Sequence, residues 1–192
     1  PVVRLYLAAA LQRISTNDKW IIATNLLKHA EDENDHNLPK MIWYGIEPLM
    51  AENPDKFLEL STASKIPLVT QYIARRAVDA DELERLVALI GKSGSNTEWL
   101  LLGMLSGMEG RTDIKIPSNW QAVSSKIQSA NAKWKTLAIE ISELFGDKEA
   151  TQRAFVILND KSAPLEQRKR VLQTLTAQQR KELVVELPNL LK

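Results

Sequence analysis

The sequence of 192 residues contains no cysteine. This absence excludes disulfide bonds, thiolate metal sites, cysteine nucleophiles and thioether-linked haem from the chain. It leaves the cellular compartment open, because a chain without cysteine is compatible with either redox environment. Glycine is scarce as well, and the seven glycines form neither a P-loop nor a dinucleotide-binding fingerprint. A Gly-x-Ser-x-Gly nucleophile elbow is also missing.

Neither sign of charge is in excess, since 25 basic and 24 acidic residues give a formal net charge of +1. We therefore expect no nucleic-acid partner, because such binding relies on a basic surface. Arg75-Arg76 and the basic cluster at 168–170 have acids nearby and lack interleaved aromatic residues, which favours solvated faces. Helical-repeat DNA glycosylases are the alternative, and they need a basic concave surface. No apolar run reaches the ~18 residues of a membrane span, so we expect no direct membrane insertion.

Strand patterns are almost absent, whereas apolar residues recur at helical spacing throughout the chain. Spacings of i, i+3, i+4 and i+7 predict helices with one buried face, and Asn, Asp, Ser, Gly and Pro stand between them. The pattern predicts about eleven helices of about ten to sixteen residues. The clearest stripes are Leu83, Leu86, Val87 and Ile90; Leu101, Met104, Leu105 and Met108; and Trp134, Leu137, Ala138, Ile141 and Phe145, and the breaks include Asn17-Asp18, Asn53-Pro54, Pro117-Ser118, Gly146-Asp147 and Ala163-Pro164.

Two segments match each other at a distance. "PVVRLYLAAA" at 1–10 and "PLVTQYIARR" at 67–76 share Pro, Val, Tyr and Ala at equal offsets, a displacement of 66 residues. This equals two helical hairpins of about 33 residues each, with first helices expected near residues 18, 53, 81, 117, 148 and 177. The sequence therefore predicts an all-α fold, an α–α superhelix (a HEAT/armadillo-like solenoid) of about five to six hairpins in a single domain over 1–192. A closed helical bundle is the alternative.

The first helix matches the second helix of a pair and is apolar on the side where a preceding helix would pack. We therefore expect the chain to be a piece of a larger multidomain protein, with an adhesive N-terminal surface. Gly103 and Gly107 lie on one face of a predicted helix, and we expect them to allow close packing of another helix.

"HAEDENDHNLPKMIWYGIEPL" at 29–49 holds both histidines of the chain and several acids. His29 and His36 are too far apart for the HExxH pattern and do not have zinc-finger spacing. The acids lack the order and the turn glycine of an EF-hand loop. We therefore expect no metal and no cofactor anywhere in the chain. The alternative for residues 29–49 is a small-ligand or hydrolytic site, with Asp35, His36, Asn37, Trp43, Tyr44 and Glu47 as the candidate residues.

The preferred interpretation of this segment is a buried joint between helices. His36 or Asn37 would cap a helix with Pro39 in its first turn, and Pro48 would limit that helix to about nine residues. Apolar residues point in all directions from it, which predicts a largely buried helix. Glu47, at its end, would need a cationic partner, for which Arg4, Arg75 and Arg76 are the candidates.

The sequence of residues 1–78 resembles the helical-repeat region of large bacterial PVC-type haem-binding proteins. These proteins are often labelled membrane-bound dehydrogenases. The match includes "DHNLP" at 35–39 and "WYGIEP" at 43–48, and continues more loosely through "GMLSGMEGR" and "APLEQRKRVLQTL". In that family the repeats lie between a β-propeller and a cytochrome c module with Cys-x-x-Cys-His. The resemblance implies the repeat domain and a periplasmic or other extracytoplasmic setting, without dehydrogenase activity or haem in this chain.

We therefore expect a non-catalytic scaffold or interaction domain. Its partners would be neighbouring domains of the same polypeptide or another protein.

Overall fold

The computed structural model describes residues 2–111, 114–145, 148–177, 182–184 and 188. These residues form twelve α-helices and one short 3₁₀ helix, without a strand, so the described chain is all-α as predicted. The helices are α1 (Val2–Ala10), α2 (Thr16–Leu26), η1 (Ala30–Asp32), α3 (Leu38–Ile46), α4 (Leu49–Glu52), α5 (Pro54–Ala63), α6 (Pro67–Asp79), α7 (Leu83–Ile90), α8 (Thr97–Met108), α9 (Trp120–Ala130), α10 (Ala132–Phe145), α11 (Lys148–Asn159) and α12 (Leu165–Ala177).

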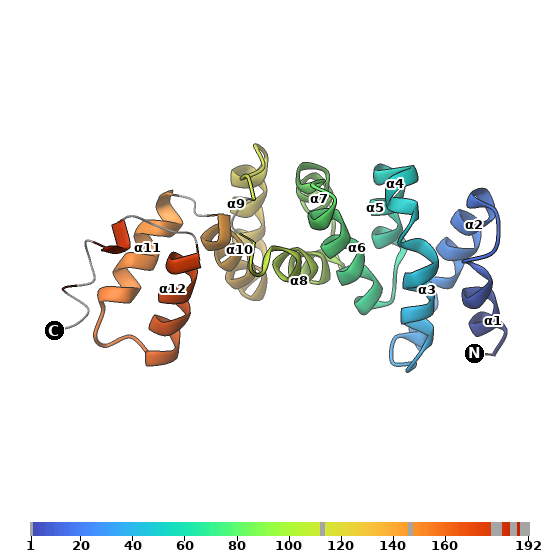
Figure 1. Ribbon diagram of the computed structural model, residues 1–192, viewed down its shortest axis with the longest axis horizontal. Coiled ribbons are helices and arrows are strands. Elements are labelled where there is room, and N and C mark those ends of the chain that lie inside the picture. The colour runs from blue at the N-terminus through green and yellow to red at the C-terminus, as the bar shows by residue number, and fades with distance from the viewer. Residues whose placement is uncertain (1, 112–113, 146–147, 178–181, 185–187, 189–192) are drawn as a thin grey trace.

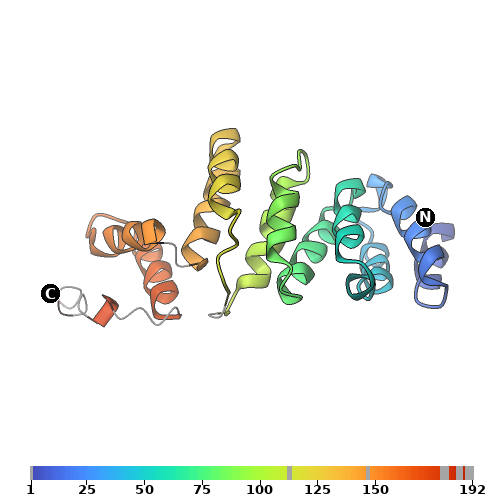
Figure 2. The same ribbon diagram turned by 90° about the horizontal axis from the view of Figure 1, so that it is seen from above.

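The helices follow one another along the long axis of the molecule, with α1 near one end and the α11–α12 pair at the other (Figures 1 and 2). Helices α2, α5, α7 and α9 form a first row, in which each helix contacts the next. Helices α1, α3, α6, α8 and α10 form a second row with the same property. The rows are joined by the pairs α2–α3, α5–α6, α7–α8 and α9–α10, and the α11–α12 pair adjoins α10.

Hydrogen bonds between helix pairs join residues about one pair apart in the sequence. Arg4 binds Asp32 across 28 positions, Arg85 binds Asp55 across 30, and Lys133 binds Glu98 across 35. The Arg111 guanidinium likewise donates to the carbonyl oxygen of Val78 across 33 positions. Each pair of helices is therefore fastened to its sequence neighbour.

The predicted apolar stripes form the core. Leu83, Leu86, Val87 and Ile90 are all buried. The stripes of α8 and α10 are buried as well except at Leu105 and Trp134, which are partly buried. Core side chains from Ala8 to Phe145 form one cluster, and α11 and α12 form a smaller one with Leu183. Among the described residues, none of the helices has the length and apolar character needed to cross a membrane.

The predicted helix boundaries were right in some places and wrong in others. First helices begin at 16, 54, 83, 120 and 148, within three residues of the predicted positions, while the start expected near 177 runs into residues outside the described ranges. Eight of the twelve described α-helices have 10 to 14 residues, within the predicted range, whereas α1, α3, α4 and α7 have 9, 9, 4 and 8 residues. The break at Asn17-Asp18 was wrong, since both lie inside α2 and the Ser15 side chain caps it by accepting from the Asp18 N–H. The break at Gly146-Asp147 lies outside the described residues.

Helices α6 and α8 pack closely because α8 has two glycines at the contact. A Cβ atom on Gly103 would overlap the carbonyl oxygen of Gln71, and one on Gly107 would lie 2.8 Å from the Cβ of Val78. Both distances are below van der Waals contact. The predicted role of these glycines in close helix packing is confirmed.

Candidate functional site

The acidic segment before α3 is part of the joint between helices. The Arg4 guanidinium donates to both carboxylate oxygens of the buried Asp32, at 2.5 and 2.8 Å. The exposed Asp35 accepts from the backbone N–H groups of Asn37 and Leu38, at 2.9 and 2.8 Å. These bonds hold the pKa of Asp35 below its ordinary value. Asn37 occupies the cap position, one of the two that were predicted, but its side chain makes no capping bond, and the Asp35 carboxylate accepts the backbone N–H groups instead.

Helix α3 has one buried face and one open face. It has nine residues with Pro39 in its first turn, as predicted, and it buries Leu38, Ile42 and Ile46. Tyr44, however, is 60% exposed. The prediction that this helix is largely buried on all sides was therefore wrong.

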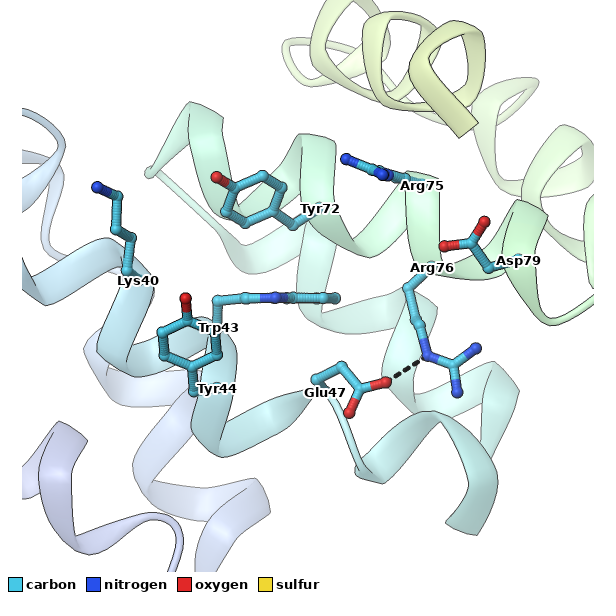
Figure 3. Close-up of a pocket in the computed structure, with 8 residues that line it drawn as sticks. All are labelled: Lys40, Trp43, Tyr44, Glu47, Tyr72, Arg75, Arg76 and Asp79. Atoms are coloured by element: carbon cyan, nitrogen blue, oxygen red, sulfur yellow. Dashed lines mark hydrogen bonds and ion pairs between the residues drawn. The ribbon is translucent and has the colours of Figure 1, made fainter. Parts of the chain in front are cut away.

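The open face of α3 and the facing side of α6 enclose a pocket of about 460 Å³ (Figure 3). This volume lies in the range of small-ligand pockets, about 300 to 1,000 Å³. Helix α3 contributes Lys40, Trp43 and Tyr44, and Glu47 directly follows its last residue. Helix α6 contributes Tyr72, Arg75, Arg76 and Asp79. Residues at i, i+3, i+4 and i+7 lie on one helix face. The lining residues of each segment have this spacing, so each segment faces the pocket with one side.

Three aromatic side chains give the pocket its apolar surface. The Trp43 ring is half-buried, with its centroid 5.3 Å from that of Tyr72 and 6.4 Å from that of the buried Phe57. Figure 3 shows the Tyr72 ring beside the Trp43 indole, with Tyr44, the next residue of α3, close to Trp43. Tyr44 is the most exposed of the three, so its ring is available to a ligand.

The charged groups of the pocket fall into one pair and three single groups. Arg76 Nε donates to Glu47 Oε1 at 2.5 Å, which confirms that one of the three predicted arginines binds this carboxylate. Within the described part of the chain, Lys40, Arg75 and Asp79 have no hydrogen bond or ion pair through their side chains. The free groups are therefore two cations and one carboxylate.

The structure divides the six candidate residues of the sequence into two groups. Trp43, Tyr44 and Glu47 line the pocket, whereas Asp35, His36 and Asn37 lie in the exposed turn before α3 and do not line it. The ligand site that the sequence suggested therefore comes together without its histidine.

The sequence interpretation missed half of the pocket. The missed half is on α6 and consists of Tyr72, Arg75, Arg76 and Asp79. These residues have the same i, i+3, i+4, i+7 spacing as the lining residues at 40–47, and this spacing could have identified them. Although no aromatic residue is interleaved with Arg75-Arg76 in the sequence, Trp43, Tyr44 and Tyr72 line the pocket with both arginines.

The side chains that line the pocket can bind a ligand. The eight lining residues include no serine, threonine, cysteine or histidine, and the Glu47 carboxylate is already engaged by Arg76. In the ranges that the structure describes, no group of three His, Cys, Asp or Glu residues is arranged to hold a metal ion. What the pocket offers a ligand is cationic donors, one free carboxylate and aromatic faces.

A second pocket of about 640 Å³ lies between α8, α10 and α12. Glu109, Glu140, Glu143 and Arg170 are among its charged residues, and Arg170 binds Glu140 at 3.4 Å. Burial raises the pKa of Glu143, and the nearby Glu140 carboxylate adds to the effect. This pocket is more acidic than the one between α3 and α6.

No protein-family model matches the chain, and neither a curated protein nor a solved structure matches it at a significant level.

Proposed function

We propose that this chain is a non-catalytic scaffold or interaction domain, built as a HEAT-like α–α superhelix of helix pairs. The observation that carries the proposal is the contact pattern. The principal contacts join helices no more than three apart in the α numbering, and the two rows contact each other pair by pair. A closed bundle would instead bring its first and last helices together. A stack held by neighbour contacts is the usual form of helical-repeat proteins, which use their extended faces for binding.

The match between 1–10 and 67–76 supports the same proposal. Helices α1 and α6 both belong to the second row, where α3 lies between them. A displacement of 66 residues therefore corresponds to two steps along one row. The contacts of α1 with α3, and of α3 with α6, support the interpretation of α1 as the second helix of a pair.

The resemblance to PVC-type haem-binding proteins suggests the wider setting. It supports a role as the helical region of a multidomain, dehydrogenase-like protein outside the cytoplasm. In that role the domain would position neighbouring domains of the polypeptide or hold another protein. An interaction domain needs an accessible binding surface, and the open pocket between α3 and α6 provides one.

Small-angle X-ray scattering tests the architecture. A compact chain of this length would have a radius of gyration of about 16 Å. The proposed superhelix predicts a clearly larger value and a distance distribution with a long tail. A value near that of a compact chain would reject the superhelix and, with it, the scaffold proposal.

A further inference from the structure

We propose that the pocket between α3 and α6 binds an extended acidic peptide segment that carries an aromatic residue. This inference rests on the proposed function, because it names the class of partner that the interaction domain would hold. It adds a ligand chemistry that follows from the free groups of the pocket and from its exposed rings.

The free charges favour a ligand that is mainly anionic. Glu47 and Arg76 neutralise each other, which leaves Lys40 and Arg75 opposite a single carboxylate, Asp79. The Lys40 ammonium and the Arg75 guanidinium can each donate hydrogen bonds to a carboxylate of a ligand. Both cations lie at the open rim, so the ion pairs would act mainly on specificity and on the rate of association.

The remaining carboxylate indicates that the ligand also has N–H donors. Asp79 lies one helical turn beyond Arg75 on α6, and neither side chain has a polar partner among the described residues. The backbone of an extended peptide offers N–H groups beside its acidic side chains. It can therefore satisfy Asp79 while its carboxylates bind Lys40 and Arg75.

The rings account for the aromatic residue in the proposed ligand. Tyr72 already packs against Trp43 at a centroid distance of 5.3 Å, whereas Tyr44 exposes most of its surface. An added aromatic side chain would extend this cluster and cover rings that are now exposed to water. Aromatic pairs of this kind add about 0.5 to 1.5 kcal/mol beyond the area they bury.

A single-stranded nucleic acid would also combine negative charge with rings, but the pocket fits it less well. Such binding requires a continuous basic groove that follows the phosphates. Here Glu47 and Asp79 stand among the cations, and the whole chain has a net charge of only +1. The free Asp79 carboxylate would repel a phosphate backbone, whereas it can accept hydrogen bonds from the backbone N–H groups of a peptide.

Fluorescence anisotropy with labelled peptides tests the proposal on the complete chain. The probe is Glu-Asp-Phe-Glu-Asp, compared with Gln-Asn-Phe-Gln-Asn, with Glu-Asp-Ala-Glu-Asp and with a short oligothymidylate. We expect saturable binding of the first peptide, which weakens as salt is added. The uncharged peptide, the alanine peptide and the oligonucleotide should bind several-fold more weakly.

Variants locate the binding site. Arg75→Gln should weaken binding about five-fold, which corresponds to one exposed ion pair. Tyr44→Ala should weaken it between about two-fold and ten-fold, the range of one aromatic contact. The matched controls Arg13→Gln and Tyr6→Ala change exposed residues that do not line the pocket, and they should leave the affinity unchanged. Circular dichroism verifies that each variant is folded.

The outcomes separate the two proposals. Equal binding of the acidic and uncharged peptides, stronger binding of the oligonucleotide, or equal losses in the controls and the pocket variants would each overturn the peptide site. An elongated particle that binds no peptide rejects the peptide site alone. A compact particle in the scattering experiment rejects the scaffold, whether or not the peptide binds.

Discussion

Arg4 and Asp32 form a bidentate ion pair that joins α1 to the turn after α2. Arg4 Nε and Nη2 donate to the two oxygens of the carboxylate, and the Asp32 side chain is only 4% exposed. The hydrogen bond to Asp32 raises the pKa of Arg4. Glu31 also approaches Arg4, at 3.3 Å, but its side chain is 59% exposed. One of the two neighbouring acids is thus structural, and the other is a surface group.

Asp32→Ala should destabilise the protein clearly more than Glu31→Ala. Removal of Asp32 leaves a largely covered guanidinium without its carboxylate, whereas loss of an exposed ion pair costs little. Urea denaturation of the two variants measures the difference. Equal midpoints would show that the ion pair does not hold α1 in place. A double-mutant cycle with Arg4→Ala would then give a coupling near zero.

Asp35→Ala should lower the urea midpoint, while Asp35→Asn should largely preserve it, because an amide oxygen can also accept the N–H groups at the start of α3. The pKa of Asp35 is lowered in the folded protein, so its carboxylate stabilises the fold above the unfolded-state pKa of about 3.9. That stabilisation is lost as the pH falls through the lower, folded-state value. A ligand-binding role without a structural one would instead leave both midpoints unchanged.

The loss of stability caused by three aromatic-to-alanine substitutions should increase with the burial of the side chain that is removed. Trp120 is 1% exposed and donates from Nε1 to Ser142, so Trp120→Ala should cost about 3 to 5 kcal/mol, as in fully buried positions. Trp43 is half-buried, and Trp43→Ala should cost less. Tyr44→Ala should change the stability by less than about 0.5 kcal/mol, because its side chain is mostly exposed. Chemical denaturation gives the order, and a Tyr44 variant as unstable as the Trp43 variant would contradict the open face of α3.

Gly103→Ala should destabilise the fold by about 1 to 3 kcal/mol, the usual cost of overpacking a core. The sign of this change in the free energy of unfolding is informative, because alanine inside a helix normally makes the fold about 1 kcal/mol more stable than glycine does. The added methyl group would overlap the carbonyl oxygen of Gln71, a backbone atom that cannot move alone. Gly94→Ala is the control, since nothing lies within 4 Å of its added Cβ. A stabilised Gly103→Ala variant would mean that α6 and α8 are not in close contact.

Much of the helical content could be predicted from the sequence, because the burial of one helix face leaves a local periodic signal. The ends of the helices were harder to predict from the sequence. The break between α9 and α10 has no glycine or proline. Asn131 instead adopts an extended conformation, and its side chain accepts from the N–H groups of Lys133 and Trp134. An asparagine within a polar stretch gives little sign of such a turn, so this break was not among those predicted.

The candidate site could be predicted only in part, because its two halves lie about 30 residues apart. The Trp-Tyr pair and Glu47 drew attention by their local context, and Arg76 could be named as a partner for a carboxylate. That Tyr72 packs against Trp43 depends on the placement of α6 beside α3. His36 looked chemically interesting in the sequence, yet its position in the turn leaves it outside the pocket. Local sequence gives residue types, whereas helix packing decides which of them meet.

Glu143→Gln should make the protein more stable at neutral pH, with a gain that disappears in acid. Burial, followed by repulsion from Glu140, raises the pKa of Glu143, although Arg153 and Arg170 act in the opposite direction. The folded protein therefore retains this proton at pH values where the unfolded chain has already released it. The stability of the wild type then falls as the pH rises, because the folded state binds more protons than the unfolded state.

The measurement is urea denaturation of the wild type and Glu143→Gln at several pH values. Below the unfolded-state pKa of about 4.3, Glu143 is protonated in both states, and the two proteins should differ little. The stability difference should grow as the pH rises and become constant above the folded-state pKa. Glu52→Gln, at an exposed position of α4, controls for the loss of a negative charge and should show no such rise. A difference that is the same at every pH would mean that Glu143 ionises alike in the folded and unfolded chains, and that its position between α10 and α12 carries no burial penalty.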